Sequence, residues 1–358
     1  MKNICDCKIK NNIIFSNTFV ENNGKDYLSK SNTNCLKGIL SICILIHHLY
    51  QRSNWLHDIW LGAVFQYMGY LAVSLFFFIS GYGLMYSYQT KKAEYIKNFP
   101  KNRLLTFYCV CILSVVIYTL FDWICGKNFK VTDILQSLTF GNTLVKSGWY
   151  LQTIFIFYIL FYFSAKYCRT NTALISMICC GTFLYIGLCL CLKLMPTWYD
   201  SIWCFAFGIL WCACKKNIDY FVCRKEKNLI ILGIALSFCI SFILGTQEFI
   251  GLIYIRLAFK MLSAVFFSAL SILLLMRLPI QNILTRNLGK ISLEIYVIHG
   301  LVLELFRGKF IFINDDLFYA VMVIAVVLCL AVMLHFIVGY IYKMIKNTGA
   351  NKQKVNCV

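Results

Sequence analysis

The sequence predicts an all-α, polytopic membrane protein with about ten transmembrane helices, and three observations carry this prediction. Hydrophobic residues make up 60% of the 358 residues and charged residues only 14%, whereas soluble domains carry about 25% charged residues. The hydrophobic residues fall in long runs. Only 3 prolines interrupt the chain, which favours continuous helices, and the alternating ten-residue pattern of an outer-membrane barrel is absent.

Ten apolar segments form the predicted membrane domain, residues 35–342. Most are long enough to cross a hydrocarbon core of about 30 Å, and the short first and sixth segments are expected inside the bundle. The ten segments are residues 35–50, 66–89, 104–121, 149–165, 172–192, 200–214, 228–245, 252–276, 283–304 and 317–342. Residues 1–34 are expected to form a disordered cytoplasmic tail, and residues 343–358 a basic cytoplasmic tail.

The net charge of +19 is explained by the loops between these segments. One set of alternate loops, together with both termini, holds 23 Lys and Arg residues, and the other set holds 8. Because cytoplasmic loops carry the excess of cations, both termini are expected in the cytoplasm. This distribution favours a multi-pass protein of a cell membrane, expected to be a bacterial plasma membrane, whose main partner is the lipid bilayer. It argues against binding of nucleic acid.

The 19 cysteines are not expected to hold a metal or to form required disulfides. Most lie in apolar runs, where cysteine behaves as a small hydrophobic residue. Two C-x-C pairs, Cys5 with Cys7 and Cys212 with Cys214, lack the further Cys or His ligands of a zinc site. We therefore expect no metal site.

The first apolar segment, Asn34 to Gln51, carries ionisable residues, although burying an ionisable side chain in a membrane costs free energy. Lys37 and His48 are eleven residues apart, which places both on one helical face with a rise of roughly 16 Å between them. A charged or titratable residue inside a membrane segment is by default a functional-site candidate. His47 lies about 100° around the helix from its neighbour, so we expect one of the two histidines to line the site and the other to pack or orient it.

Two more polar residues are expected at the depth of His48. Counting from the cytoplasmic flanks at 1.5 Å per residue places His48, Ser80 and His299 all roughly 16–20 Å from the inner boundary. The three side chains are therefore expected to line one cavity; the alternative is that each makes only a local hydrogen bond. His335 is expected to be a hydrogen-bonded core histidine.

Basic and aromatic residues mark two further candidate positions. Lys101 and Arg103 precede the third segment, where they either anchor the protein by the positive-inside rule or bind the phosphates of a cytoplasmic donor. Trp149 opens the fourth segment at the outer boundary. Such a tryptophan belongs either to the aromatic belt or to a substrate site.

The chain resembles the acyltransferase-3 family of integral-membrane O-acyltransferases over about residues 34 to 342. The motifs that carry the resemblance are Lys37-(ten residues)-His48, G-Y-L-A-V-S-L-F-F-F-I-S-G-Y at 69–82, K-N-R-L-L at 101–105, W-Y-L at 149–151 and L-G-K-I-S-L-E-I-Y-V-I-H-G at 288–300. The family usually has Arg where this chain has Lys37, and a proline common after the third motif is missing. No single motif is specific, but the five occur together and in order.

The resemblance implies transfer of an acyl group, most often acetyl, from cytoplasmic acyl-coenzyme A to a hydroxyl of a cell-surface or exported carbohydrate. The donor phosphates would bind Lys101 and Arg103, and no permanently bound cofactor is expected. His48 would act as general base or as acyl carrier, with Lys37 at the inner mouth. The residues expected to orient the imidazole, polarise the carbonyl or contact substrate are Ser80, Tyr296, His299, His47 and Trp149.

Two other functions stay open on the residues alone. A transporter or flippase for a glycan or lipid would use intramembrane His and Lys as gating or proton-relay groups, although no broken helix pairs of the kind found in many transporters are visible. A catalytically inactive scaffold of a surface-polysaccharide system is the third possibility, because Lys37 replaces the usual Arg. The sequence predicts neither the oligomeric state nor the identity of the acceptor sugar.

Overall fold

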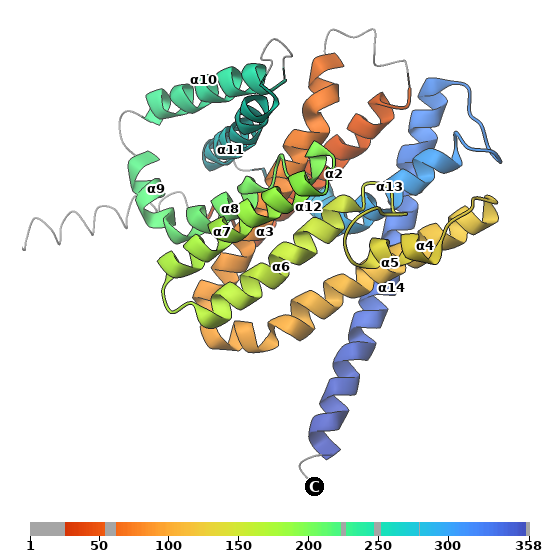
Figure 1. The fold of residues 1–358 in the computed structure, drawn as a ribbon, viewed down its shortest axis with the longest axis horizontal. Helices are drawn as coiled ribbons and strands as arrows, with labels where there is room; N and C mark the ends of the chain where they lie inside the picture. The colour runs from red at the N-terminus through yellow and green to blue at the C-terminus, as the bar shows by residue number, and fades with distance from the viewer. Residues whose placement is uncertain (1–25, 54–61, 223–226, 247–251, 279, 356–358) are drawn as a thin grey trace, which may run out of the picture.

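The computed structural model describes residues 26–53, 62–222, 227–246, 252–278 and 280–355, and among them it contains helices and no strand (Figure 1). The elements are α2 (Lys30–Tyr50), α3 (Gly62–Phe99), the π-helix η1 (Pro100–Leu105), α4 (Thr106–Ile124), α5 (Val131–Leu138), α6 (Trp149–Tyr167), α7 (Asn171–Cys191), the 3-10 turn η2 (Pro196–Trp198), α8 (Trp203–Ala213), α9 (Lys215–Val222), α10 (Lys227–Thr246), α11 (Ile253–Arg277), α12 (Ile283–Lys290), α13 (Ser292–Leu305) and α14 (Asp316–Val355). The all-α prediction is confirmed.

Each of the ten predicted segments lies mostly on helix. The apolar character of these helices is that of a membrane protein. Five stretches in the described part of the chain are long and apolar enough to cross a bilayer: Val64–Ile124, Asn171–Cys191, Asn228–Thr246, Ile253–Arg277 and Asp316–Met344. The first of these stretches contains both α3 and α4, joined by η1 without a loop. The count of ten spans and the cytoplasmic position of both termini stay predictions.

The structured chain begins earlier than the predicted boundary at residue 34. Helix α2 starts at Lys30, and the Ser29 hydroxyl accepts a hydrogen bond from the Asn32 backbone N–H as its cap. The Tyr27 hydroxyl donates to Asp219 on α9 at 2.7 Å. At the other end α14 continues to Val355, well past residue 342. The predicted tail over residues 1–25 lies outside the described residues.

The ninth predicted segment, residues 283–304, is not one helix. It breaks at Ile291 (φ −106°, ψ 15°) into the short α12 and the buried α13. Helix α12 packs against α2 in direct backbone contact, which only glycine allows at two positions. A Cβ atom at Gly38 would lie 2.0 Å from the Thr285 carbonyl oxygen, and one at Gly289 would lie 1.8 Å from that of Asn34. The two glycines therefore position the start of α2 against α12 and the rest of α2 beside α13.

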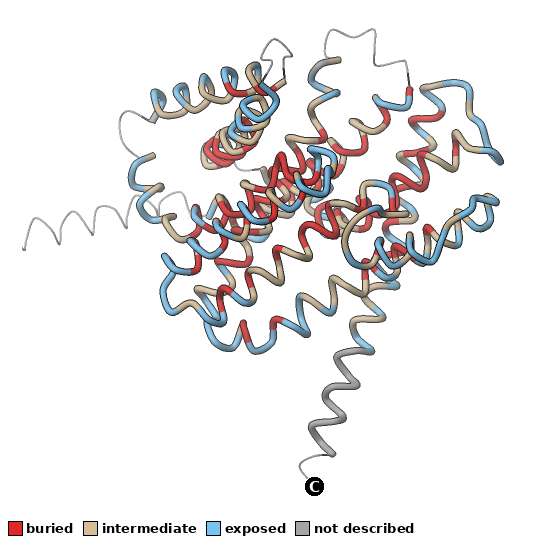
Figure 2. Tube along the Cα trace, viewed as in Figure 1, coloured by how far each residue is buried: buried red, intermediate tan, exposed pale blue. Residues whose placement is uncertain are grey.

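A second pair of glycines brings α3 against α8. A Cβ atom at Gly81 or at Gly208 would lie 2.1 Å from a backbone oxygen of the opposite helix. Around this contact the largest side chains are fully buried, among them Phe77, Phe78 and Phe205. Buried residues concentrate on α2, α3, α6, α8 and α13 in the centre of the bundle (Figure 2). Apart from Lys101 and Arg103 on η1, the candidate site residues come from α2, α3, α6 and α13.

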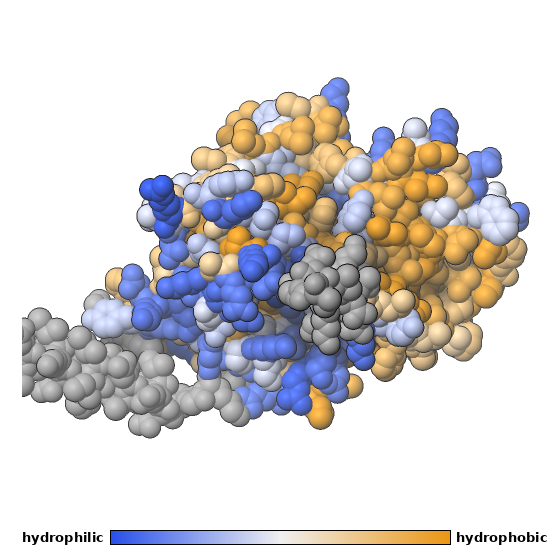
Figure 3. Space-filling view, turned by 90° about the horizontal axis from the view of Figure 1, so that it is seen from below, coloured by the Kyte–Doolittle hydropathy of each residue, from blue (hydrophilic) through white to orange (hydrophobic). Residues whose placement is uncertain are grey.

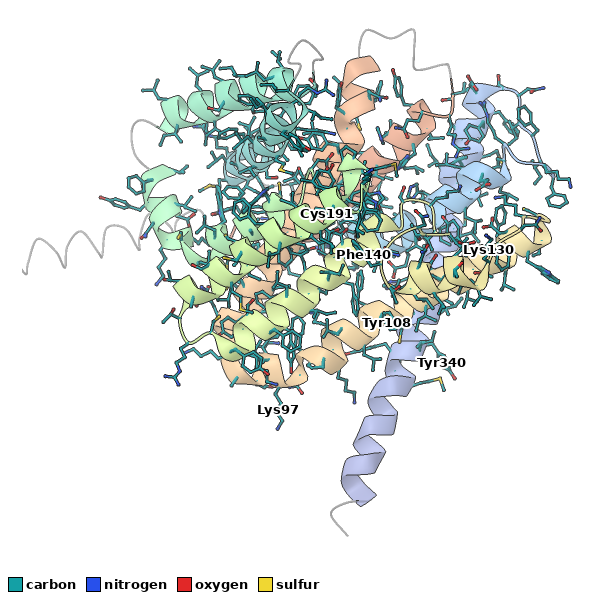
Figure 4. The ribbon with its side chains drawn as sticks, viewed as in Figure 1. Lys97, Tyr108, Lys130, Phe140, Cys191 and Tyr340 are labelled. Atoms are coloured by element: carbon teal, nitrogen blue, oxygen red, sulfur yellow. The ribbon has the colours of Figure 1, made fainter. Side chains whose placement is uncertain are left out.

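The remaining helices lie around this centre. Helices α10 and α11 pair at one edge, and α14 runs from α13 past α4 toward the C-terminus (Figure 1). In Figure 4 the labelled Lys97 lies near the start of α4, and Lys130 lies toward its opposite end. Polar and apolar side chains gather in separate areas of the face shown in Figure 3, as expected for a protein whose apolar sides contact lipid.

Candidate active site

Three histidines meet where α2 approaches α13. The ring of His48 stacks on that of His299, with centroids 4.9 Å apart and planes 23° from parallel. The ring of His47 lies 4.9 Å from that of His48 at an angle of 60°. His299 is buried, with 1% of its surface exposed. The structure therefore brings together His48 and His299, which are more than 250 residues apart in the chain.

Each imidazole is held by a hydrogen bond at Nδ1. In His299 this nitrogen lies 2.5 Å from the Tyr296 carbonyl oxygen, and in His47 it lies 2.9 Å from the Phe65 carbonyl oxygen. A carbonyl only accepts, so both Nδ1 atoms carry a proton. The His47 ring also lies directly over Gly69 of α3, where a Cβ atom would be 2.3 Å from it. His47 thus ties α2 to α3, while His48 turns toward α13.

A cavity of about 280 Å³, here called the basic cavity, opens beside the first turns of α2. Lys37 and Arg103 line it together with Ser80, Glu294 and several tyrosines. Neither of these two cations forms an ion pair with any residue in the described ranges. Two unpaired cations at one cavity are suited to a polyanionic group such as a phosphate.

Ser80 belongs to this basic cavity, and the expectation that it shares a cavity with His48 is wrong. Its side chain lies beside the hydroxyl groups of Tyr150 and Tyr158. Depth in a membrane gives only the position of a residue along its helix and not the direction in which the side chain points.

Lys101 does not line the basic cavity, whereas its neighbours Asn102 and Arg103 do. Lys101 is exposed on the π-helix η1. Arg103 is exposed as well, but successive residues of a helix point in different directions, and the Arg103 side chain reaches the cavity. Of the two cations predicted to bind donor phosphates, only Arg103 is therefore placed at the cavity.

A second cavity, of about 320 Å³, contains His48 and is here called the histidine cavity. His47, Gln51 and Trp149 also line it. Of the two alternatives for Trp149, a place at a cavity is compatible with the substrate site. Its remaining polar lining includes Tyr70, Ser147, Thr197, Asp200 and Ser201. These side chains supply both hydrogen-bond donors and acceptors next to the imidazole.

Asp200 is a residue of this cavity that the sequence did not single out. It is buried, with 2% of its surface exposed, and its Oδ1 accepts a hydrogen bond from the Ser201 hydroxyl at 2.9 Å. The Lys260 ammonium lies 2.9 Å from Oδ2, although the contact lacks the alignment of a hydrogen bond. Asp200 is the first residue of the sixth predicted apolar segment, and an acid in a membrane segment is the signal that would have pointed to it.

Tyr296 stands between the two cavities. It lines both of them, and it also lines a small cavity between them that His299 and Phe76 share. Its hydroxyl donates to the Ser147 carbonyl oxygen at 2.7 Å, and its ring packs against Tyr150 with centroids 5.0 Å apart. The tyrosine ring therefore separates the basic cavity from the histidine cavity.

Glu294, which lines the basic cavity, pairs with a histidine of another helix. Its carboxylate pairs with His335 of α14 at 2.7 Å, while Lys290, four residues earlier, donates to Asn287 at 3.0 Å. The side chain of His335 is 46% exposed. The prediction of a core histidine is therefore wrong for this residue, although the expected hydrogen bond is present.

A comparison with protein-family models matches residues 31–336 to the acyltransferase-3 model, described as an acyltransferase domain. The match covers most of the chain, so the chain belongs to this family of membrane acyltransferases. It matches no curated protein and no solved structure. Within the described residues, no group of three or more His, Cys, Asp or Glu side chains is arranged to hold a metal ion.

Proposed function

We propose that this membrane acyltransferase moves an acyl group, acetyl in the first instance, from cytoplasmic acyl-coenzyme A to a hydroxyl of an exported or cell-surface carbohydrate. One observation carries the proposal: the stacked His48 and His299 lie where a cavity with unpaired cations approaches a cavity with hydroxyl-binding groups. A base placed between a donor cavity and an acceptor cavity is what acyl transfer across a membrane requires.

The basic cavity is the proposed donor site. Arg103 offers a planar set of N–H donors to phosphate, and Lys37 adds a second positive charge. Both side chains line the same cavity as the small residues Ser80 and Ser292, which leave room for the narrow thioester arm of coenzyme A. The acyl end would then reach His48 after passing Tyr296, which separates the two cavities.

The histidine cavity is the proposed acceptor site. The Trp149 ring supplies an apolar face against which a sugar ring packs, and Thr197, Asp200 and Ser201 supply hydrogen-bonding groups. A neutral imidazole in this cavity is a suitable general base for a hydroxyl. His48 therefore either takes the hydroxyl proton directly or first accepts the acyl group and passes it to the hydroxyl.

Complementation of a deletion strain tests the proposal. Native protein, the His48→Ala variant and the His47→Ala variant are expressed at equal levels, and ester-linked acetyl on the surface polysaccharide is measured. We expect native protein to restore the acetyl groups and His48→Ala to abolish them, with a smaller loss in His47→Ala because His47 binds Phe65 instead. Full acetylation by the His48→Ala variant would show that the catalytic assignment is wrong.

A measurement on purified protein separates transferase from transporter. A transferase of this kind is expected to hydrolyse acetyl-coenzyme A slowly when no acceptor is present, because water can replace the acceptor hydroxyl. A protein that binds glycan or lipid but releases no coenzyme A under any condition would instead support the transport reading.

A further inference from the structure

The direction of proton transfer at His48 depends on which ring nitrogen carries the proton. Neutral imidazole holds one proton and one lone pair, and the hydrogen bond made by one nitrogen decides which nitrogen remains basic. For His47 and His299 this choice is made by backbone carbonyls. For His48 it is made by a side chain.

The side chain is that of Gln51. Its Oε1 lies 3.0 Å from His48 Nδ1, and among the described residues this is the hydrogen-bonding contact that His48 makes. At the end of α2 the backbone N–H of Gln51 donates to the His47 carbonyl oxygen at 3.1 Å, and that of Arg52 donates to the Leu49 carbonyl oxygen at 3.0 Å. Both bonds involve only backbone atoms, so the end of α2 should form in the same way when the Gln51 side chain is replaced.

The other polar groups around His48 do not replace this contact. His299 from α13 and His47 from α2 both use their Nδ1 atoms elsewhere, and Arg52 offers only donors. Across the cavity, Asp200 is engaged by Ser201 and Lys260, and the Tyr70 hydroxyl bonds to the Lys260 carbonyl oxygen and to Ser263.

We infer that Gln51 is a positioning residue for the transfer reaction: its amide oxygen accepts from His48 Nδ1–H and leaves Nε2 as the basic nitrogen. The inference rests on the proposed function. In the transfer, Nε2 takes the proton of the acceptor hydroxyl, the hydroxyl oxygen bonds to the acyl carbon, and the carbon–sulfur bond breaks. The proton then goes from Nε2 to the departing thiolate, which leaves as the thiol of coenzyme A.

Two substitutions with opposite hydrogen-bonding properties test the inference. Gln51→Leu removes the acceptor, while Gln51→Glu keeps an acceptor that cannot donate when ionised. Loss of the group that orients a metal-bound histidine typically reduces activity by about 10- to 100-fold, and we apply the same range to the orientation of His48. We expect that reduction in kcat for Gln51→Leu, with an unchanged KM for acetyl-coenzyme A, and recovery of most of the rate in Gln51→Glu.

The pH dependence provides the readout that a purely structural role would not change. A carboxylate next to Nδ1 stabilises the protonated imidazole, so the acid limb of the pH–rate profile of Gln51→Glu is expected to move to higher pH. The groups that face His48 and share its electrostatic environment are His47, His299, Arg52, Tyr70 and Asp200, and they are the same in both variants.

Gln66→Leu is the matched control, because Gln66 is an exposed glutamine of α3 that lines neither cavity. It is expected to behave like the native protein. A native rate in Gln51→Leu would show that Gln51 has no role. An inactive Gln51→Glu with an unshifted profile would show that the amide donates and that the opposite nitrogen is basic. Activity in His48→Ala would instead overturn the proposed function, and the inference with it.

Discussion

The rings of His48 and His299 stack at a centroid distance of 4.9 Å, although one belongs to the first helix of the domain and the other to the ninth predicted segment. The contact exists because α2 packs against both α12 and α13. Two imidazoles at this distance share one electrostatic environment. A change in either ring is therefore expected to alter the chemistry of the other.

The first prediction concerns this pair. His299→Ala is expected to lower the rate of acyl transfer by about 10²-fold, at the lower end of the range for groups that assist proton transfer. Because the two rings act in one site, the double variant with His48→Ala should be no slower than His48→Ala alone. Single-turnover release of coenzyme A measures all three variants. Strictly additive losses would contradict a shared role for the two rings.

The second prediction separates the two cations of the K-N-R-L-L motif. Arg103→Ala removes a cation that lines the basic cavity, and it should raise the KM for acetyl-coenzyme A by about tenfold, equivalent to a loss of about 1.4 kcal/mol. Lys101→Ala removes an exposed cation and should change this KM much less. Steady-state kinetics at two salt concentrations provides the measurement.

Dephospho-coenzyme A thioester serves as the control donor for that experiment, because it lacks one phosphate group. If Arg103 binds a different group of the donor, the loss on Arg103→Ala should be the same for both donors. Equal effects of Lys101→Ala and Arg103→Ala would show that position at the cavity does not matter.

The third prediction concerns Tyr296. Replacing this residue with Ala removes the ring between the two cavities and the hydrogen bond to the Ser147 carbonyl oxygen. Water from the histidine cavity should then reach the thioester, so hydrolysis of acetyl-coenzyme A should rise relative to transfer. The ratio of coenzyme A released to acetyl ester formed measures this uncoupling. Tyr296→Phe keeps the ring and should stay close to the native ratio.

The fourth prediction tests the packing that positions α2. Gly289→Ala would place a Cβ atom 1.8 Å from the Asn34 carbonyl oxygen, so α12 must move away from α2. Such overpacking typically costs about 1–3 kcal/mol. A lower midpoint of thermal unfolding in detergent is expected, together with a loss of activity.

Gly187→Ala on α7 is the control for that substitution. A Cβ atom there meets no other atom within 4 Å, and Ala is favoured over Gly in a helix by about 1 kcal/mol. This variant should be as stable as the native protein or more stable. Equal stability of the Gly289 and Gly187 variants would show that the close contact between α2 and α12 has no effect on stability.

Local composition and spacing were enough to predict the helical architecture and part of the site. Long apolar runs have few stable structures in a bilayer other than helices, so each of the ten predicted segments coincides with helix. The eleven-residue separation of Lys37 and His48 likewise requires one helical face. Both conclusions depend on interactions between residues that are near each other in the chain.

The tertiary structure decided which polar groups meet. Ser80 lies at the predicted depth but lines the basic cavity, because the rotation of α3 about its axis is set by packing at Gly81 and Gly208. On the two sides of the break at Ile291, α12 and α13 both pack against α2, and Glu294 of α13 pairs with His335 of α14. Gln51 and Asp200 become site residues only through the cavity that they share with His48.

The sequence by itself thus determined a helical membrane protein with a basic residue and a histidine on one face of its first helix. The tertiary structure alone decided that His48 stacks on His299, that Tyr296 separates two cavities and that Arg103, rather than Lys101, lines the basic one. The physical reason is that helix formation depends on residues a few positions apart, whereas the direction of each side chain depends on how whole helices pack.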